Sequence, residues 1–414
     1  MFQAAIAWQV FQISGSTLQL GLIGLTRFVP QLLLTLVAGA VADSYDRRKV
    51  ILIAQIAPFV CSLAILGLTL SHLITLPWIY FLVFWIAIAS AFDQPSRQSL
   101  LPQLVPVEVF PRAVTVASSV SQLAFVVGPM VGGLLIARYS VAGAYAIYAV
   151  LVAISWLSLS RVQPRFAARG RRGVTVKAIK EGLAFLRRNQ VAFGAMTLDM
   201  FALIFGGATA LLPVYATKIL HVGAGGYGLL TSSLGIGALL MSVLLMVLPP
   251  VKRTGIVLIS TVAVFGLMTM LFGISRAFVF SLIAYALTGA ADQVSVVMRQ
   301  AAIQLTTPDE FRGRVNAVNS LFVGASVHVG GIESGLVAAA ANATFAVVSG
   351  GAACVAVVGI VAATMPDLRR YRMEQAEHVV ARALRENIKS QKTPTTAGTS
   401  PPSEEPAGEA AAGD

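Results

Sequence analysis

Residues 39–49 read Gly-Ala-Val-Ala-Asp-Ser-Tyr-Asp-Arg-Arg-Lys, at the point where one long apolar run, 18–42, gives way to another, 50–71. Each run is longer than the roughly 20 residues that an α-helix needs to cross a bilayer. The polar segment between them is therefore predicted to be a short turn at the membrane surface. Because Lys and Arg accumulate in cytoplasmic turns, its three basic residues predict that this turn faces the cytoplasm.

The composition extends this interpretation to the whole chain. Of 414 residues, 57% are hydrophobic and only 12% are charged, whereas a water-soluble protein carries about 25% charged residues. The hydrophobic residues would supply about 12 spans of roughly 20 residues each. The net charge of +12 does not indicate a nucleic-acid partner, because the basic residues lie in short stretches between apolar runs. We therefore predict an all-α integral membrane protein.

Eleven apolar runs reach the length of a membrane helix. Residues 2–13 are also apolar, but twelve residues cover only about 18 Å of a bilayer core about 30 Å thick. We expect this segment to be part of a first helix that is truncated in the given sequence. The eleven runs are 18–42, 50–71, 77–93, 113–137, 140–160, 191–217, 227–248, 254–274, 277–298, 315–340 and 342–365.

The basic residues alternate between the two sides of the predicted membrane. With twelve spans, 26 of the 30 Lys and Arg residues fall on the side of the 39–49 turn. The opposite side receives only Arg138, Lys218 and Arg276, and Arg27 lies inside a span. The positive-inside rule then predicts a multi-pass plasma-membrane protein (the inner membrane of a bacterium) with a cytoplasmic C-terminus.

A polar stretch divides the chain into two halves of six spans. We expect an N-terminal half at 1–160, a cytoplasmic linker loop at 161–189, a C-terminal half at 190–365 and a cytoplasmic tail at 366–414. Within the tail, residues 367–392 have apolar residues at helical spacing among many basic ones, which is typical of an amphipathic helix near anionic lipid. From about residue 393, a composition rich in Pro, Thr, Gly and Glu predicts disorder.

The two halves are internal repeats. At an offset of 202 residues, the matching charges and prolines carry more weight than the apolar identities. Two halves with the same topology form a parallel repeat, the arrangement of transporters that rock about a central site. The clearest matches are Arg97 with Arg299, Gln98 with Gln300, Pro106 with Pro308, Glu108 with Glu310, Arg112 with Arg314, Gly128 with Gly330 and Gly133 with Gly335.

The 39–49 segment resembles the loop motif of the major facilitator superfamily, Gly-x-x-x-Asp-x-x-Gly-Arg-(Arg/Lys), with Asp46 in place of the second glycine. A bare positive-inside turn would explain the basic residues but not the two aspartates. The resemblance implies the major facilitator fold of two six-helix bundles and a cytoplasmic latch that closes in the outward-facing state. The latch residues it implies are Gly39, Asp43, Asp46, Arg47, Arg48, Arg97, Arg312 and Arg314.

A second motif indicates the direction of transport. Gly128, Pro129, Gly132 and Gly133 resemble the Gly-Pro-x-x-Gly-Gly motif that proton-coupled exporters of the superfamily carry in their fifth helix. A generic packing face of small residues is the alternative explanation. Residues 91–98 and the prolines that follow resemble the branch that contains the enterobactin exporter and related bacterial efflux permeases.

Ionisable residues inside spans are costly and therefore suggest function. Asp199 is the first candidate for proton coupling, with a structural carboxylate bonded to a neighbouring Ser or Thr as the alternative. Arg27 and Glu333 are expected to pair as an extracellular gate, unless each points separately into an aqueous cavity. His328 is expected either to share a proton with Glu333 or simply to pack. Phe81, Trp85 and Phe92 recur on one helix face and are candidates for the substrate cavity, against ordinary packing.

Together these features predict a secondary active transporter, a proton-coupled antiporter that exports small amphipathic siderophore-like or drug-like molecules by alternating access. A proton-coupled uptake symporter of the same fold is the alternative. We expect no enzymatic activity, no catalytic residues, no metal, and no cofactor beyond the proton gradient. The expected partners are the small-molecule substrate and membrane lipids, with no nucleic acid, and the expected state is a monomer.

Overall fold

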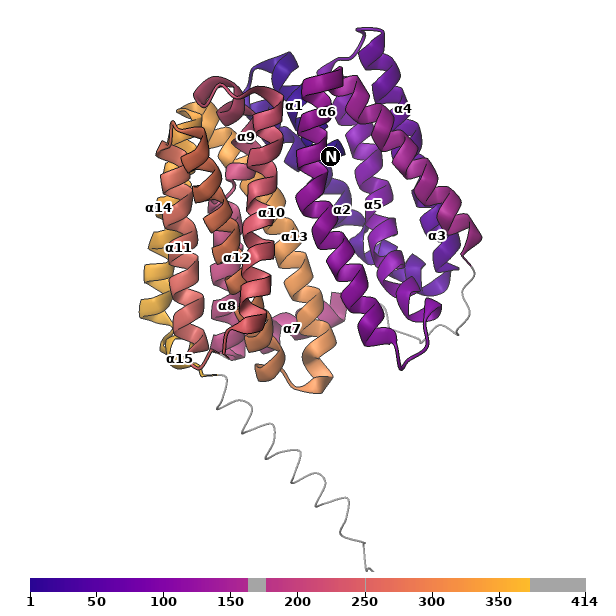
Figure 1. Cartoon of the computed structure of the whole chain (residues 1–414). Coiled ribbons are helices and arrows are strands. Elements are labelled where there is room, and N and C mark those ends of the chain that lie inside the picture. The colour runs from indigo at the N-terminus through magenta and orange to yellow at the C-terminus, as the bar shows by residue number, and fades with distance from the viewer. Residues whose placement is uncertain (163–175, 250, 373–414) are drawn as a thin grey trace, which may run out of the picture. The chain divides into compact units, whose positions relative to one another are not determined.

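The computed structural model describes residues 1–162, 176–249 and 251–372, without the side chains of 36, 42, 43, 176–179 and 309, and this part of the chain is helical and contains no strand (Figure 1). Of the amphipathic segment predicted at 367–392 only residues 367–372 are described, and the rest of it, together with the part predicted to be disordered, lies outside the described residues. The helices are α1 Phe2–Ser14, α2 Thr17–Ser44, α3 Arg47–Ala54, α4 Ile56–Leu70, α5 Leu76–Leu104, α6 Phe110–Arg161, α7 Val176–Arg188, α8 Gln190–Phe205, a 3₁₀ turn η1 Ala208–Leu211, α9 Leu212–Val214, a π turn η2 Tyr215–Ile219, α10 Gly223–Val247, α11 Thr254–Ile274, α12 Phe278–Thr306, α13 Asp309–Ala340, α14 Ala343–Thr364 and α15 Pro366–Arg370.

The membrane-spanning helices agree with the sequence once α6 is divided. Ten helices of the described chain are long and apolar enough to cross a membrane. One of them, α6, has 52 residues and contains two predicted spans, 113–137 and 140–160. At the start of the second, Ser140 has φ 71° and ψ 174°, which breaks the helix between the two spans. Counting α6 twice gives eleven spans, and α1, with 13 residues, is the short first segment. The predicted all-helical membrane fold is confirmed.

Two stretches expected to be loops are mostly helical. Residues 94–112 and 299–314 carry charges and were predicted to lie outside the spans. In the structure α5 continues to Leu104 and α12 to Thr306, so Arg97 and Arg299 are helical residues. Hydropathy marks the apolar bilayer core rather than the end of a helix, because backbone hydrogen bonds continue into the polar region.

The turns between the helices lie at two opposite ends of the bundle. The Gly15 end carries the turn between α1 and α2, and the Asp46 end carries the turn between α2 and α3. Met1 lies part-way along the bundle, against Gly128 and Gly132 of α6 (Figure 1). Turns 71–75, 220–222, 275–277 and 341–342 lie at the Gly15 end, and turn residues 105–109, 248–249, 251–253 and 307–308 lie at the Asp46 end.

The halves meet along two helix pairs, α6 with α10 and α2 with α13. Both pairs cross at glycines. A Cβ on Gly133 would lie 2.5 Å from the Cα of Gly228, and a Cβ on Gly335 would lie 2.8 Å from the Cα of Gly21. Because real Cβ atoms do not approach backbone this closely, only glycine allows these backbones to touch. Gly133 and Gly335 are equivalent in the repeat, so the same glycine makes the contact in each half.

The largest apolar cluster joins the halves near the Gly15 end. There Trp8 of α1 stacks on Tyr227 of α10 with ring centroids 5.3 Å apart, and the Tyr227 hydroxyl donates to the carbonyl of Ala4 at 3.2 Å. Tyr145 of α6 is fully buried in the same cluster. This shared core holds the two halves together at the Gly15 end.

The linker expected to be a loop at 161–189 contains a helix, α7. Its Leu186 is 1% exposed and belongs to a small core with Val315 and Val318 of α13. Phe185 stacks on Phe311 with centroids 5.0 Å apart. The predicted loop is therefore wrong over Val176–Arg188: its apolar residues recur at helical spacing and find a partner surface on the C-terminal half.

Candidate transport site

A buried ion pair lies between α8 and α12. The Arg299 guanidinium donates through Nη1 to Oδ2 of Asp199, and both side chains are almost completely buried. Asp199 is thus paired with an arginine rather than with a neighbouring Ser or Thr. A pair buried this deeply is costly to desolvate, and removing one partner leaves an unbalanced charge. Residues 100 positions apart form this pair, so spacing alone gave no sign of it.

A second carboxyl group belongs to the same cluster. Asp292 lies on α12, about two turns before Arg299, and interacts electrostatically with both Asp199 and Arg299. The Nε of Arg299 has no hydrogen-bond partner among the described side chains. Two acids therefore share one guanidinium inside the C-terminal half. With both acids ionised the cluster carries one net negative charge, and one added proton makes it neutral.

The repeat places a related pair in the N-terminal half, in a different environment. Arg97, which matches Arg299, donates through Nε to Asp93 Oδ2 at 2.5 Å, one turn away on the same helix, α5. Its side chain is 48% exposed. Arg97, which is expected in the cytoplasmic latch, is therefore bonded to a residue of its own helix in this conformation.

Arg27 lies where the halves meet but is not paired with Glu333. Among the described residues no ion pair joins them, and the nearest hydrogen bond of Glu333 is from the Ser334 hydroxyl at 3.4 Å. The antiparallel packing of α2 against α13 explains this, since it puts Gly24 beside His328. Arg27 is then about level with His328, and Glu333 lies five residues, about 7.5 Å, farther along α13.

Polar and aromatic groups surround Arg27 instead. The guanidinium interacts electrostatically with Tyr148 of α6 and Tyr227 of α10. Nearby, His328 Nε2 lies 3.1 Å from Oε1 of Gln31, which is one turn from Arg27 on α2. His328 therefore bonds across the two halves rather than with Glu333. The expected proton sharing between His328 and Glu333 is not seen in this conformation.

The 39–49 motif forms a capped turn. Asp46 accepts a hydrogen bond from the backbone N–H of Arg48 at 3.0 Å and so caps the N-terminus of α3. This explains an aspartate where the superfamily motif has glycine. Arg47 is the first residue of α3, and Asp43 lies in the last turn of α2 with its side chain outside the described part.

The rest of the predicted latch is spread over both halves. Arg48 donates to the carbonyls of Leu159, at 3.3 Å, and Ser160, at the C-terminal end of α6, where a cation is favourable. Arg314 of α13, two residues after Arg312, forms an ion pair with Glu181 of α7 at 3.1 Å.

Gly39, in contrast, has open space around the position of a Cβ, so it makes no close helix contact here. Among the latch residues whose bonds are described above, Arg48 and Arg97 bond within the N-terminal half and Arg314 bonds to α7, so none of these three bonds joins the two halves.

The glycines of the α6 motif serve two contacts. Gly133 crosses α10, as described above, and Pro129 contributes a carbonyl 2.9 Å from the position of a Cβ on Gly228. Gly128 and Gly132 face Met1, at 3.2 and 3.1 Å from their Cβ positions. The motif is a packing surface toward both α1 and the opposite half.

The aromatic candidates on α5 are exposed. Phe81 is 52% and Trp85 46% exposed, and their ring centroids lie 6.3 Å apart. Phe92, farther along α5, is partly buried. Their part in a substrate cavity stays a prediction.

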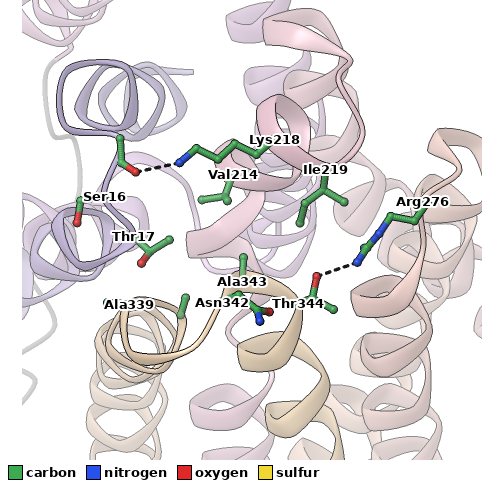
Figure 2. A pocket seen from close by; sticks show the side chains of 12 residues that line it. Ser16, Thr17, Val214, Lys218, Ile219, Arg276, Ala339, Asn342, Ala343 and Thr344 are labelled. Atoms are coloured by element: carbon green, nitrogen blue, oxygen red, sulfur yellow. Dashed lines mark hydrogen bonds between the residues drawn. The ribbon is translucent and has the colours of Figure 1, made fainter.

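A pocket of about 640 Å³ opens at the Gly15 end (Figure 2). Sequence reasoning missed it, because it joins turns from both halves. It is lined by Gly15, Ser16, Thr17, Val214, Lys218, Ile219, Arg276, Ala338, Ala339, Asn342, Ala343 and Thr344.

Comparison with known proteins agrees with this geometry. The nucleoside transporter NupG shares the fold with a TM-score of 0.68 and 14% sequence identity, covering 89% of this chain and 97% of NupG. An inward-facing, unoccupied bacterial homolog of the human lysosomal transporter Spinster gives a TM-score of 0.64 at 13% identity over 89% of this chain and 93% of that chain. At this level of identity these likenesses show the fold, two helical halves joined in one membrane-spanning bundle.

The chain belongs to the transmembrane secretion effector family of the major facilitator superfamily, whose sequence pattern matches residues 1–397. The enterobactin exporter EntS of Escherichia coli O1:K1 / APEC is 27% identical over 318 residues, which cover 76% of this chain and 75% of EntS. EntS of Escherichia coli O81 (strain ED1a) matches with the same identity and coverage. The chain is therefore a multi-pass membrane transporter.

Proposed function

We propose that the protein is a proton-coupled exporter that carries small amphipathic molecules, siderophore-like or drug-like, out of the cytoplasm by alternating access. The family of secretion effectors and the similarity to the enterobactin exporter support the direction of transport. The distribution of basic residues supports a cytoplasmic Asp46 end and a cytoplasmic C-terminus in the inner membrane. The substrate leaves chemically unchanged, and the proton gradient supplies the energy.

The buried cluster of Asp199, Asp292 and Arg299 is the observation that carries the proton coupling. A protein interior disfavours net charge, so the cluster is favoured when one of its two acids is protonated. Because the cluster joins α8 and α12, a change in its charge alters the interaction between these two helices. This gives protons a means to bias the C-terminal half between conformations.

The coupling is tested with proteoliposomes that contain a trapped pH dye. A proton gradient is imposed, and a panel of catecholate siderophores and lipophilic drugs is added. We expect Asp199→Asn and Asp292→Asn to abolish substrate-dependent proton flux. Glu108→Gln is the matched control, since it removes an exposed acid in the 105–109 turn, and it should leave the flux unchanged.

Each result decides one part of the proposal. Substrate transport by Asp199→Asn with an unchanged pH profile would remove Asp199 from the coupling mechanism. Substrate and protons moving in the same direction would identify an uptake symporter instead of an exporter. Flux with catecholates but not with drugs, or the reverse, would define the substrate class.

A further inference from the structure

The pocket at the Gly15 end is built from both halves of the protein. Gly15, Ser16 and Thr17 come from the turn between α1 and α2, and the other lining residues come from the C-terminal half. Its volume of about 640 Å³ lies within the range of about 300–1,000 Å³ that is typical of small-molecule sites. None of Asp199, Asp292 and Arg299 lines it, so the pocket is separate from the buried cluster.

Two cations line this pocket. Lys218 comes from η2 and Arg276 from the turn before α12, and no Asp or Glu is among the lining residues (Figure 2). They are two of the three basic residues predicted on this side of the membrane. Since basic residues are generally depleted from the outer side of membrane proteins, their meeting in one pocket is unlike the rest of that surface.

Both cations keep donors free for a ligand. Lys218 Nζ donates to the carbonyl of Gly15 at 3.3 Å and lies 5.3 Å from the Phe11 ring centroid. Arg276 donates to the carbonyl of Ser275 at 3.1 Å and to the Thr344 hydroxyl at 3.2 Å. Within the described chain neither cation forms an ion pair with a carboxylate, so their charges are not balanced.

The N-terminus of α14 adds to the positive potential. Asn342, Ala343 and Thr344, its cap and first two residues, line the pocket. The first turn of α14 contains no acidic residue. A helix N-terminus carries a partial positive charge that favours a negative group nearby.

We propose that this pocket binds a small organic anion with carboxylate or phosphate groups, held by Lys218 and Arg276 at the outer face of the transporter. The cavity is larger than a single oxyanion needs, so the ligand carries an organic body as well as its charge. The anion comes either from the medium or from the headgroup of an anionic phospholipid.

The same geometry makes binding sensitive to conformation. The ligand contacts the N-terminal half only while Gly15 lies beside Lys218, that is, while the Gly15 end is closed. Opening this end separates the two sets of lining residues. A bound anion therefore favours the closed outer face by its difference in affinity between the two states.

The site is tested by thermal unfolding of the purified full chain in nanodiscs, with citrate as the probe and sodium chloride at matched ionic strength as the reference. In phosphatidylcholine nanodiscs we expect citrate at about ten times its dissociation constant to raise the unfolding temperature by about 2 °C. The double variant Lys218→Gln/Arg276→Gln should lose this rise. Arg138→Gln is the matched control, because it removes an exposed basic residue on the same side but outside the pocket, and it should keep the rise.

Nanodiscs that contain phosphatidylglycerol identify the source of the anion. If the lipid itself raises the unfolding temperature of the wild type and removes the response to citrate, the ligand is a headgroup. If citrate acts equally in both lipids, the ligand is a soluble anion. The proposal is overturned if citrate and phosphatidylglycerol both have no effect, or if the double variant responds like the wild type. These measurements do not involve transport, so they are independent of the proposed export activity.

Discussion

At the scale of single residues, the repeat uses one arginine in two environments. Arg97 is about half exposed and bonds to Asp93 on its own helix. Arg299 is buried and bonds to Asp199 on a different helix. Exposed ion pairs contribute little, because water and salt screen the charges. A buried ion pair contributes little to the net free energy of unfolding, because desolvation offsets its attraction. Removing only one partner lowers that free energy strongly, because the other charge stays buried without compensation.

This difference predicts unequal effects of the same substitution. Arg299→Gln should lower the free energy of unfolding by about 3 kcal/mol, because Asp199 and Asp292 lose their counter-charge. Arg97→Gln should cost less than about 1 kcal/mol. Denaturant unfolding of the two variants in the same detergent measures both values.

A double variant separates the charge from the packing. Asp199→Asn together with Arg299→Gln removes both members of the pair, and we expect it to recover part of the stability lost by Arg299→Gln alone, since Asp292 still lacks its counter-charge. Equal losses for Arg97→Gln and Arg299→Gln, or no recovery in the double variant, would contradict the buried-pair explanation.

At the scale of helices, the two glycine crossings determine how the halves contact each other. Gly133 of α6 and Gly335 of α13 occupy equivalent places in the repeat, and each touches a glycine of the opposite half. Small residues let helices approach closely enough for extensive van der Waals contact, which drives helix association where water is absent. A methyl group at either position would force α6 from α10, or α2 from α13.

Gly133→Ala and Gly335→Ala should therefore shift the protein away from the conformation that is closed at the Gly15 end. We expect each to lower the rate of substrate transport at least tenfold, a loss of about 1.4 kcal/mol in the cycle. Gly359→Ala on α14 is the control, since open space surrounds its Cβ position. Normal transport by Gly133→Ala would show that the α6–α10 crossing is not critical for the cycle.

At the scale of the whole molecule, the halves are joined at the Gly15 end and separate toward the Asp46 end. Every residue from 114 to 121 of α6 is exposed. This stretch exceeds two helical turns, so all faces of the helix are free at that level. A helix packed on one side would instead show buried residues every three or four positions.

Labelling with a membrane-impermeant maleimide tests both this conformation and the orientation. The native cysteines, Cys61 and Cys354, are buried, so background labelling should be low. Ser119→Cys should react only from the cytoplasmic side. Leu73→Cys, at a position 66% exposed at the Gly15 end, should react only from outside. Reaction of Ser119→Cys from outside would reverse the proposed orientation.

The sequence alone was enough to predict the features that depend on the transfer of side chains from water into lipid. The number and place of the spans follow from apolar length, and the repeat follows from matched residues such as Arg97 and Arg299. The loop motif predicted the superfamily. Helix ends were less predictable: α5, α12 and α7 extend through polar sequence, since helices form beyond the apolar core wherever they find a packing partner.

The sequence by itself thus determined the fold class, the division into two repeats and Asp199 as a buried charge of interest, because bilayer energetics act on each residue locally. Only the tertiary structure decided what these residues contact. In the tertiary structure Asp199 pairs with Arg299, Arg27 is separate from Glu333, and Lys218 and Arg276 line one pocket. These outcomes depend on helix rotation and on the depth at which antiparallel helices align, and both are set by close packing at glycines far apart in the chain.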